Sequence, residues 1–201
     1  MKPAYLSSRA LTIRETLLGL TLLMVLLAMI IPLWLRSTVI RHGDGSTQAL
    51  SNLRQLQLAT YQMTLDLKGD PNSPAWTSLN GKPLAYAQWR SLLIEGKYLN
   101  PQDFTKLTTL TDRGGWFGGN RAVSNAITVY AVCKDDPDTT LLFTTKNWHG
   151  LDAKSLSGAP FETRGFAVFR KGGDGAILLN KLCQRADLIG SGGKFNYQPL
   201  Q

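Results

Sequence analysis

The fold of this chain is decided by one stretch, 10-ALTIRETLLGLTLLMVLLAMIIPLWL-35, in which a carboxylate precedes a long uncharged run. At about 1.5 Å per helical residue, the run reaches across the ~30 Å hydrocarbon core of a bilayer, where a helix satisfies its own backbone. Its apolar core is longer than that of a secretory signal, and no small-residue cleavage site follows it. The sequence therefore predicts a long N-terminal hydrophobic transmembrane helix.

Glu15 is the carboxylate that directly precedes this run. Burying a charge at the centre of a membrane helix costs roughly 2.5–3.5 kcal/mol on insertion scales, so Glu15 needs a partner. Two solutions are open: Glu15 reaches the headgroups of a plain anchor helix, or it pairs with a cation inside an assembly. Pro32, near the end of the run, removes one helical hydrogen bond and permits a kink.

These residues resemble the N-terminus of type IV pilins and type II secretion pseudopilins, which carry a prepilin-type cleavage and methylation segment. A short basic leader, residues 1–10, ends in the small residue Ala10. Leu11 would begin the mature chain, with Glu15 as its fifth residue and Pro32 as its twenty-second. The resemblance implies cleavage between Ala10 and Leu11 by a prepilin peptidase and methylation of the new amine. It also implies that Glu15 pairs with the terminal amine of a neighbouring subunit.

Two positions depart from the family pattern. Ala10 stands where the family usually has glycine before the cleaved bond. Arg14 stands beside Glu15, where an apolar residue is usual, and offers that carboxylate a local cation. Because a local partner weakens pairing between subunits, these departures favour a minor subunit over the main filament builder.

The rest of the chain reads as helices followed by strands. Apolar residues at three- and four-residue spacing predict an amphipathic helix over 47–67, and a second helix is expected over 84–99. Alternating apolar stretches predict one β-hairpin within 127–144 and another within 165–179. Turn-forming residues and termini indicate a loop at 69–83, an irregular segment at 112–120 and a loose tail at 190–201.

The predicted fold class is therefore α+β and pilin-like, with the amphipathic helix packed on a small antiparallel β-sheet. Three parts are expected: a leader over 1–10, a transmembrane and filament-core helix over 11–35, and a soluble globular domain over 36–201. One helix and one small domain are also what 201 residues allow.

Cys133 and Cys183 are the two cysteines, and both fall in the domain that the resemblance implies is exported. An even count in an oxidising compartment permits one disulfide. Closing a loop of about 50 residues would stabilise the fold by roughly 3–4 kcal/mol on the chain-entropy model. Pilins often carry a disulfide in their C-terminal region, so the resemblance implies a Cys133–Cys183 disulfide. Two buried free thiols are the alternative.

Composition and spacing argue against other classes. The net charge is +8, but the basic residues are scattered, so nucleic-acid binding is not expected. A nucleophile pair of Cys133 and His149 is set aside because an exported cysteine is more often structural, and no catalytic residues or enzyme activity are predicted. Asp135, Asp136 and Asp138 are interpreted as a solvated turn in preference to a calcium site. No cofactor or metal is predicted.

The predicted function is that of a minor structural subunit of a type II secretion pseudopilus or a type IV pilus-like filament. The expected partners are other pilin-like subunits, prepilin peptidase, an inner-membrane assembly platform and the membrane itself. The expected location is a single pass of the inner membrane with the C-terminal domain in the periplasm, and then the filament or cell surface. The alternative is a permanently anchored envelope protein whose exported domain binds a ligand or partner through Trp76, Trp116 and Trp148.

Overall fold

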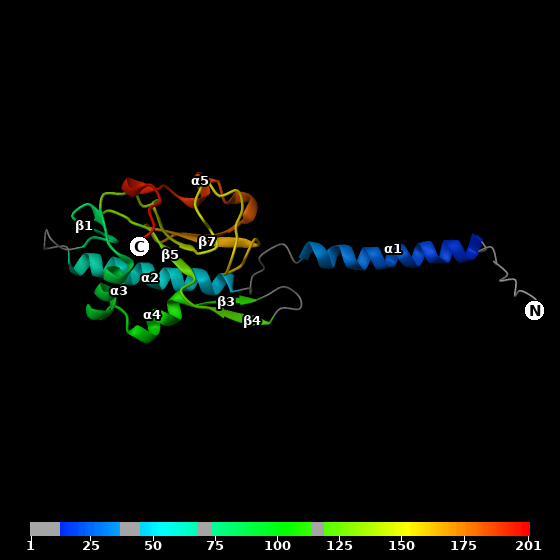
Figure 1. Cartoon of the computed structure of the whole chain (residues 1–201), viewed down its shortest axis with the longest axis horizontal. Coiled ribbons are helices and arrows are strands. Elements are labelled where there is room, and N and C mark those ends of the chain that lie inside the picture. The colour runs from blue at the N-terminus through cyan, green and yellow to red at the C-terminus, as the bar shows by residue number, and fades with distance from the viewer. Residues whose placement is uncertain (1–12, 37–44, 68–73, 114–118) are drawn as a thin grey trace, which may run out of the picture. The chain divides into compact units, whose positions relative to one another are not determined.

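The computed structural model describes residues 13–36, 45–67, 74–113 and 119–201. The chain divides into two compact units, Met1–Thr38 and Val39–Gln201. The described part of the first unit is one helix of 24 residues, α1 (Ile13–Arg36) (Figure 1). The second unit is α+β with small antiparallel sheets.

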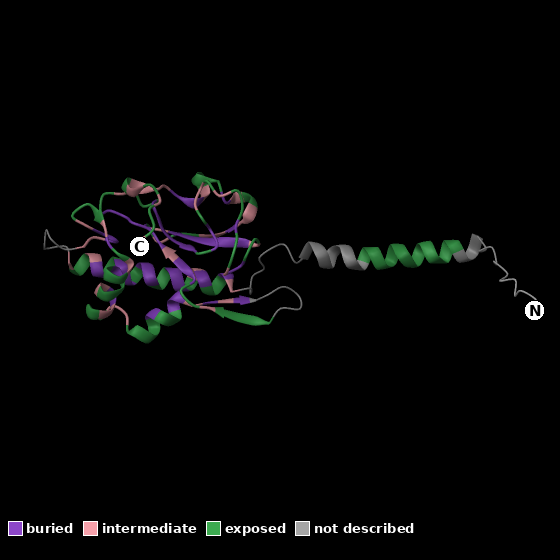
Figure 2. Cartoon of the chain, in the orientation of Figure 1, coloured by how far each residue is buried: buried purple, intermediate pink, exposed green. Residues whose placement is uncertain are grey.

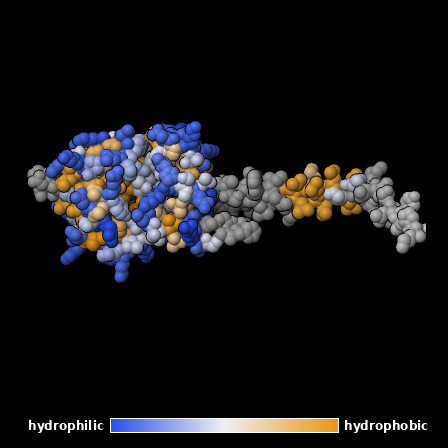
Figure 3. All heavy atoms as spheres, viewed as in Figure 1, coloured by the Kyte–Doolittle hydropathy of each residue, from blue (hydrophilic) through white to orange (hydrophobic). Residues whose placement is uncertain are grey.

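The transmembrane prediction is wrong. Over the described ranges, no helix combines the length and the apolarity needed to cross a membrane. The finding contradicts the transmembrane helix predicted over 11–35, and with it the single inner-membrane pass and periplasmic placement. The α1 side chains that are described cover residues 16–28. That stretch is largely apolar (Figure 3).

The described residues of the second unit form one long helix, several short ones and three antiparallel sheets. Its helices are α2 (Ser46–Asp66), α3 (Tyr86–Glu95), α4 (Pro101–Thr108) and α5 (Ala186–Ile189), with 3₁₀ turns at Asn180–Leu182 and Gly193–Phe195. Two hairpins pair β1 (Ser78–Leu79) with β2 (Lys82–Pro83) and β3 (Leu110–Arg113) with β4 (Asn120–Val123). The largest sheet has the order β5 (Ile127–Val129), β6 (Leu141–Thr145), β7 (Gly165–Arg170), β8 (Gly175–Leu179).

Helix α2 packs one face into the core and leaves the other exposed (Figure 2). The buried stripe of Ala49, Leu53, Leu56 and Met63 follows the spacing read from the sequence, so the predicted amphipathic helix is confirmed. Thr60 interrupts this stripe, yet its hydroxyl is fully buried and donates to the Leu56 carbonyl at 2.8 Å. A buried polar side chain is tolerated here because it is hydrogen-bonded.

Both predicted β-hairpins are confirmed, as β5–β6 and β7–β8. Successive β7 side chains point to opposite faces of the sheet, as the pleat requires. Ala167 and Phe169 join the core beneath α2, whereas Phe166 and Val168 join a second core on the other face. The four-stranded sheet is therefore a middle layer with apolar packing on both sides.

The second predicted helix, over 84–99, is present as the shorter α3 (Tyr86–Glu95). One helix, α4, was not predicted, and two predictions about connecting segments are wrong. Asn100 and Pro101 begin a helix, α4, because the Asn100 side chain accepts from the Asp103 amide at 2.7 Å and proline fits the first turn. The described ends of segment 112–120 are strand residues of the β3–β4 hairpin. The predicted loose tail is hydrogen-bonded to the fold, with the Leu200 amide donating to the Val129 carbonyl at 2.8 Å.

Tyr130 in the second core gives a prediction about alkaline stability. It is 4 % exposed, and its burial raises the pKa of the phenol to about 12. The unfolded chain loses this proton near pH 10, so the contribution of Tyr130 is complete below pH 10 and is lost as the pH rises towards 12. Between pH 9 and 11, the free energy of unfolding should fall by about 1.4 kcal/mol more in the wild type than in Tyr130→Phe. Urea unfolding at pH 9 and at pH 11 measures the two free energies for each protein. An equal fall in the wild type and in Tyr130→Phe would contradict the prediction.

Candidate functional site

The residues predicted for processing and assembly lie at the N-terminus. Ala10 and Leu11 are outside the described residues. Glu15 and Pro32 are in helix α1, but their side chains are not among those described. The structure therefore brings none of the four into a described contact.

Cys133 and Cys183 are both buried and both free, so the predicted disulfide is not formed. The Cys133 sulfur lies 3.6 Å from the Ser78 hydroxyl oxygen, and the Cys183 sulfur lies 3.6 Å from the Ala153 carbonyl oxygen. Each thiol has its own neighbours in the fold. The structure has the alternative arrangement of two buried free thiols.

The tryptophans proposed as exposed contacts are not exposed where they are described. Trp76 is 6 % exposed and Trp148 is 2 % exposed, whereas Trp116 is outside the described residues. Both described indoles face the interior, so the prediction is wrong for them. An aromatic residue in a loop-rich sequence does not reveal from spacing alone whether the chain folds over it.

The structure does not bring Cys133 and His149 together, and it keeps the Asp135–Asp138 turn apart from other metal-ligating side chains in the described ranges. His149 Nε2 lies 2.9 Å from the Ser157 hydroxyl oxygen, whereas Cys133 contacts Ser78, so each has a different partner. Asp136 uses both carboxylate oxygens to accept backbone amide protons. Within the described ranges, no group of three or more His, Cys, Asp or Glu side chains could hold a metal ion.

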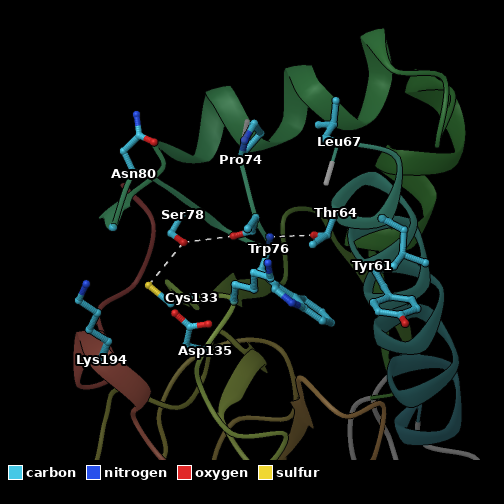
Figure 4. Close-up of a pocket in the computed structure, with 14 residues that line it drawn as sticks. Tyr61, Thr64, Leu67, Pro74, Trp76, Ser78, Asn80, Cys133, Asp135 and Lys194 are labelled. Atoms are coloured by element: carbon cyan, nitrogen blue, oxygen red, sulfur yellow. Dashed lines mark hydrogen bonds between the residues drawn. The ribbon is translucent and has the colours of Figure 1, made fainter. Parts of the chain in front are cut away.

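A cavity of about 750 Å³ lies at the C-terminal end of α2 (Figure 4). Its residues come from α2, the segment around the β1–β2 turn, the chain after β5 and the 3₁₀ turn near the C-terminus. Figure 4 shows Tyr61 and Leu67 on one side, Lys194 and Asn80 on the other, and Trp76 between them. The volume falls in the ~300–1,000 Å³ range of small-molecule sites. We name this cavity the Trp76 pocket.

The first wall of the Trp76 pocket is apolar and comes from α2. Tyr61 and Leu65 line it and remain 43 % and 47 % exposed. The Tyr61 and Trp76 ring centroids are 5.6 Å apart, and the Trp76 amide donates to the Thr64 hydroxyl oxygen at 2.8 Å. Trp76 adopts a φ of 59°, in the left-handed region that is rare for a bulky residue. The hydrogen bond and the ring contact hold this unusual backbone in place.

The second wall is charged and consists of Lys134, Asp135 and Lys194. Asp136 joins the two chain segments that form this wall. One of its carboxylate oxygens accepts from the Cys133 amide at 2.6 Å, and the other accepts from the Lys194 amide at 2.8 Å. Gly193 allows this approach, since a Cβ built there would lie 2.8 Å from the Asp136 carboxylate and its φ is +57°. The two lysines are therefore held on neighbouring segments of one wall.

Lys171 supports this wall from the interior. Its side chain is buried, and its ammonium donates to the Lys134 carbonyl at 2.6 Å and to the Asp136 carbonyl. The ammonium also lies 5.6 Å from the centroid of the Trp76 ring, a cation–π distance. Lys171 thus ties the charged wall to Trp76, and it lines a second recess of about 440 Å³ that also contacts Tyr61 and Trp76.

Comparison with known proteins found no family model, no curated protein and no solved structure that matches this chain.

Sequence reasoning missed the Trp76 pocket because its walls come from distant parts of the chain. One local signal was available: Asn80-Gly81 is a two-residue hairpin turn, with φ values of +49° and +70°, inside the segment predicted as a loop. That signal predicts the β1–β2 hairpin but not its neighbours. The approach of Lys194 to this region depends on the Asp136 contacts, which the sequence does not reveal.

Proposed function

We propose that this chain is a structural subunit, of the minor kind, of a pilin-like filament such as a type II secretion pseudopilus or a type IV pilus. The observation that carries the proposal is the N-terminal pattern: a short basic leader ending at Ala10, an apolar Leu11, Glu15 and the uncharged run after it. A prepilin peptidase would cleave between Ala10 and Leu11. Other copies or related subunits would then pack along the apolar segment.

The exposure of α1 supports this assembly role. Its described large apolar side chains range from 43 % exposed at Leu27 to 71 % at Leu18. A helix that is apolar around its whole circumference is stable in water only when something covers it, and large exposed apolar patches mark interaction sites. Packing between like helices would cover these side chains, and a carboxylate paired with a neighbour's amine would fix their axial register.

Processing is the first test of the proposal. The N-terminal sequence and mass of the full-length protein should be measured after co-expression with and without a prepilin peptidase. We expect a mature chain that begins at a methylated Leu11 when the peptidase is present and an uncut chain when it is absent. An uncut Met1 or Lys2 start under both conditions would overturn the proposal.

Glu15 provides the assembly prediction. In Glu15→Gln the side chain keeps its size but cannot form an ion pair, so we expect filament incorporation to fall by at least about tenfold, as for a lost buried charge pair. Incorporation is measured by quantifying the protein in sheared filament fractions. Cleavage at Leu11 should be unchanged.

Glu162→Gln is the matched control, because Glu162 is an exposed glutamate of the second unit. It should be incorporated like the wild type. If both variants assemble equally well, Glu15 has no role in pairing and the filament proposal loses its main physical support.

A further inference from the structure

We propose that the Trp76 pocket is a binding site for an anionic organic molecule with an apolar or aromatic body. Its acid group would lie near Lys134 and Lys194, and its body would lie against Tyr61 and Leu65. The site belongs to the second unit and does not depend on the N-terminal assembly pattern, so it goes beyond the filament role.

The charge of the pocket favours an acid. Lys134 and Lys194 contribute two ammonium groups, and Asp135 contributes the opposing carboxylate. Among the described side chains, neither ammonium lies in an ion pair. The neighbouring Asp136 is not available to neutralise them, because its oxygens accept backbone amide protons. A carboxylate, sulfonate or phosphate would form charge-assisted hydrogen bonds with these lysines.

The opposite wall favours an apolar body. Tyr61 and Leu65 leave nearly half of their surface open to solvent, although they flank the buried Trp76. Covering this surface with a ligand removes apolar area from water, which is the dominant favourable contribution in most binding. An acid without such a body would use one wall only, and an apolar molecule without an acid would leave the lysines without a partner.

The pocket is also held in shape before any ligand arrives. Asp136 fixes the relation between the two lysine-bearing segments, and buried Lys171 fixes the Lys134 carbonyl relative to Trp76. Sites whose supporting groups are already positioned lose less entropy on binding. The unusual φ of Trp76 belongs to the same arrangement, since strained residues cluster at ligand sites.

The test compares two fluorescent probes that differ in one acid group: anilinonaphthalene sulfonate and the neutral phenylnaphthylamine. Both are titrated into the full-length protein. In Lys134→Gln/Lys194→Gln, we expect the sulfonate probe to bind about tenfold more weakly, whereas the neutral probe is unaffected. In Tyr61→Ala, we expect both probes to bind several-fold more weakly, as for the loss of one aromatic contact.

Lys154→Gln/Lys181→Gln is the matched control, because both lysines are exposed, do not line the pocket and carry the same total charge. Probe binding to the apolar α1 surface is common to all variants and cancels in the comparison. Far-UV circular dichroism checks that each variant is folded. Equal sulfonate affinity in the pocket and control pairs, or an equal loss for the neutral probe, would overturn the proposal.

Discussion

Replacing Trp89 with alanine is expected to lower the free energy of unfolding of the second unit by about 3–5 kcal/mol, the usual cost of deleting a buried aromatic side chain. Trp89 is fully buried in the core beneath α2. Its ring centroid lies 5.7 Å from that of Phe104 on α4 and 6.0 Å from that of Phe143 on β6. Its Nε1 donates to the Thr60 hydroxyl oxygen of α2 at 3.3 Å.

One indole therefore joins three helices to the central sheet, and its loss leaves a cavity that rigid elements cannot close. Since domains are stable by only about 5–15 kcal/mol, the variant should unfold at much lower urea concentration. Urea unfolding followed by far-UV circular dichroism measures the change. Trp89→Phe keeps most of the ring contacts but not the hydrogen bond, and should cost about 1–2 kcal/mol.

Tyr61→Ala is the control for this prediction, because Tyr61 is an aromatic residue on α2 that is 43 % exposed. Its removal should change stability by no more than about 1 kcal/mol. A similar loss for Trp89→Ala and Tyr61→Ala would show that the core around Trp89 does not organise the unit.

Replacing Arg164 with alanine is expected to destabilise the same unit by about 3–5 kcal/mol, because it removes one partner of a poorly hydrated ion pair. Arg164 pairs with Asp112 of β3, and the two side chains are 11 % and 10 % exposed. The Arg164 side chain also donates to the Phe161 carbonyl at 3.3 Å. Without arginine, the Asp112 carboxylate remains in a site that water hardly reaches.

A double-mutant cycle separates the pair from its surroundings. Asp112→Ala/Arg164→Ala should be less destabilised than the sum of the two single variants, because no unpaired charge remains. Arg185→Ala is the control, since its pair with Asp187 is more than half exposed and water screens it. Its urea midpoint should not change. Strictly additive effects of Asp112→Ala and Arg164→Ala would contradict the ion-pair explanation.

The parts of the fold that the sequence predicted correctly are those with a strong local period. The stripe of Leu53, Leu56 and Met63 predicted α2, and alternating apolar residues predicted both hairpins of the central sheet. In each case the spacing of apolar residues within one segment is enough to predict whether that segment is a helix or a strand. The same logic did not find α4: Asn100-Pro101 predicts the end of the preceding helix, whereas α3 already ends at Glu95 and Asn100 is the N-cap of α4.

The candidate site was harder to predict because it depends on contacts between distant residues. Trp76 looked like an exposed aromatic contact, but the Lys171 ammonium and Tyr61 enclose it. Cys133 and Cys183 looked like a disulfide from their even number, but separate neighbours surround them. Tertiary packing decides both outcomes, and a count or a spacing carries no information about it. The N-terminal residues that support the filament proposal stay a prediction.

The hydrogen bonds of the C-terminal segment have a consequence for aggregation. Strand β5 is at one edge of the four-stranded sheet, and the residues that follow it pair with the C-terminal segment. The Ala131 amide donates to the Gln198 carbonyl, and Tyr130 forms a β-bridge with Pro199. Unpaired edge strands are templates for association between molecules. The segment therefore acts as a guard strand, and because it follows every strand of the sheet in the sequence, this edge stays open during synthesis until the segment has emerged. In that interval a newly made chain is most prone to aggregate with other chains through this edge.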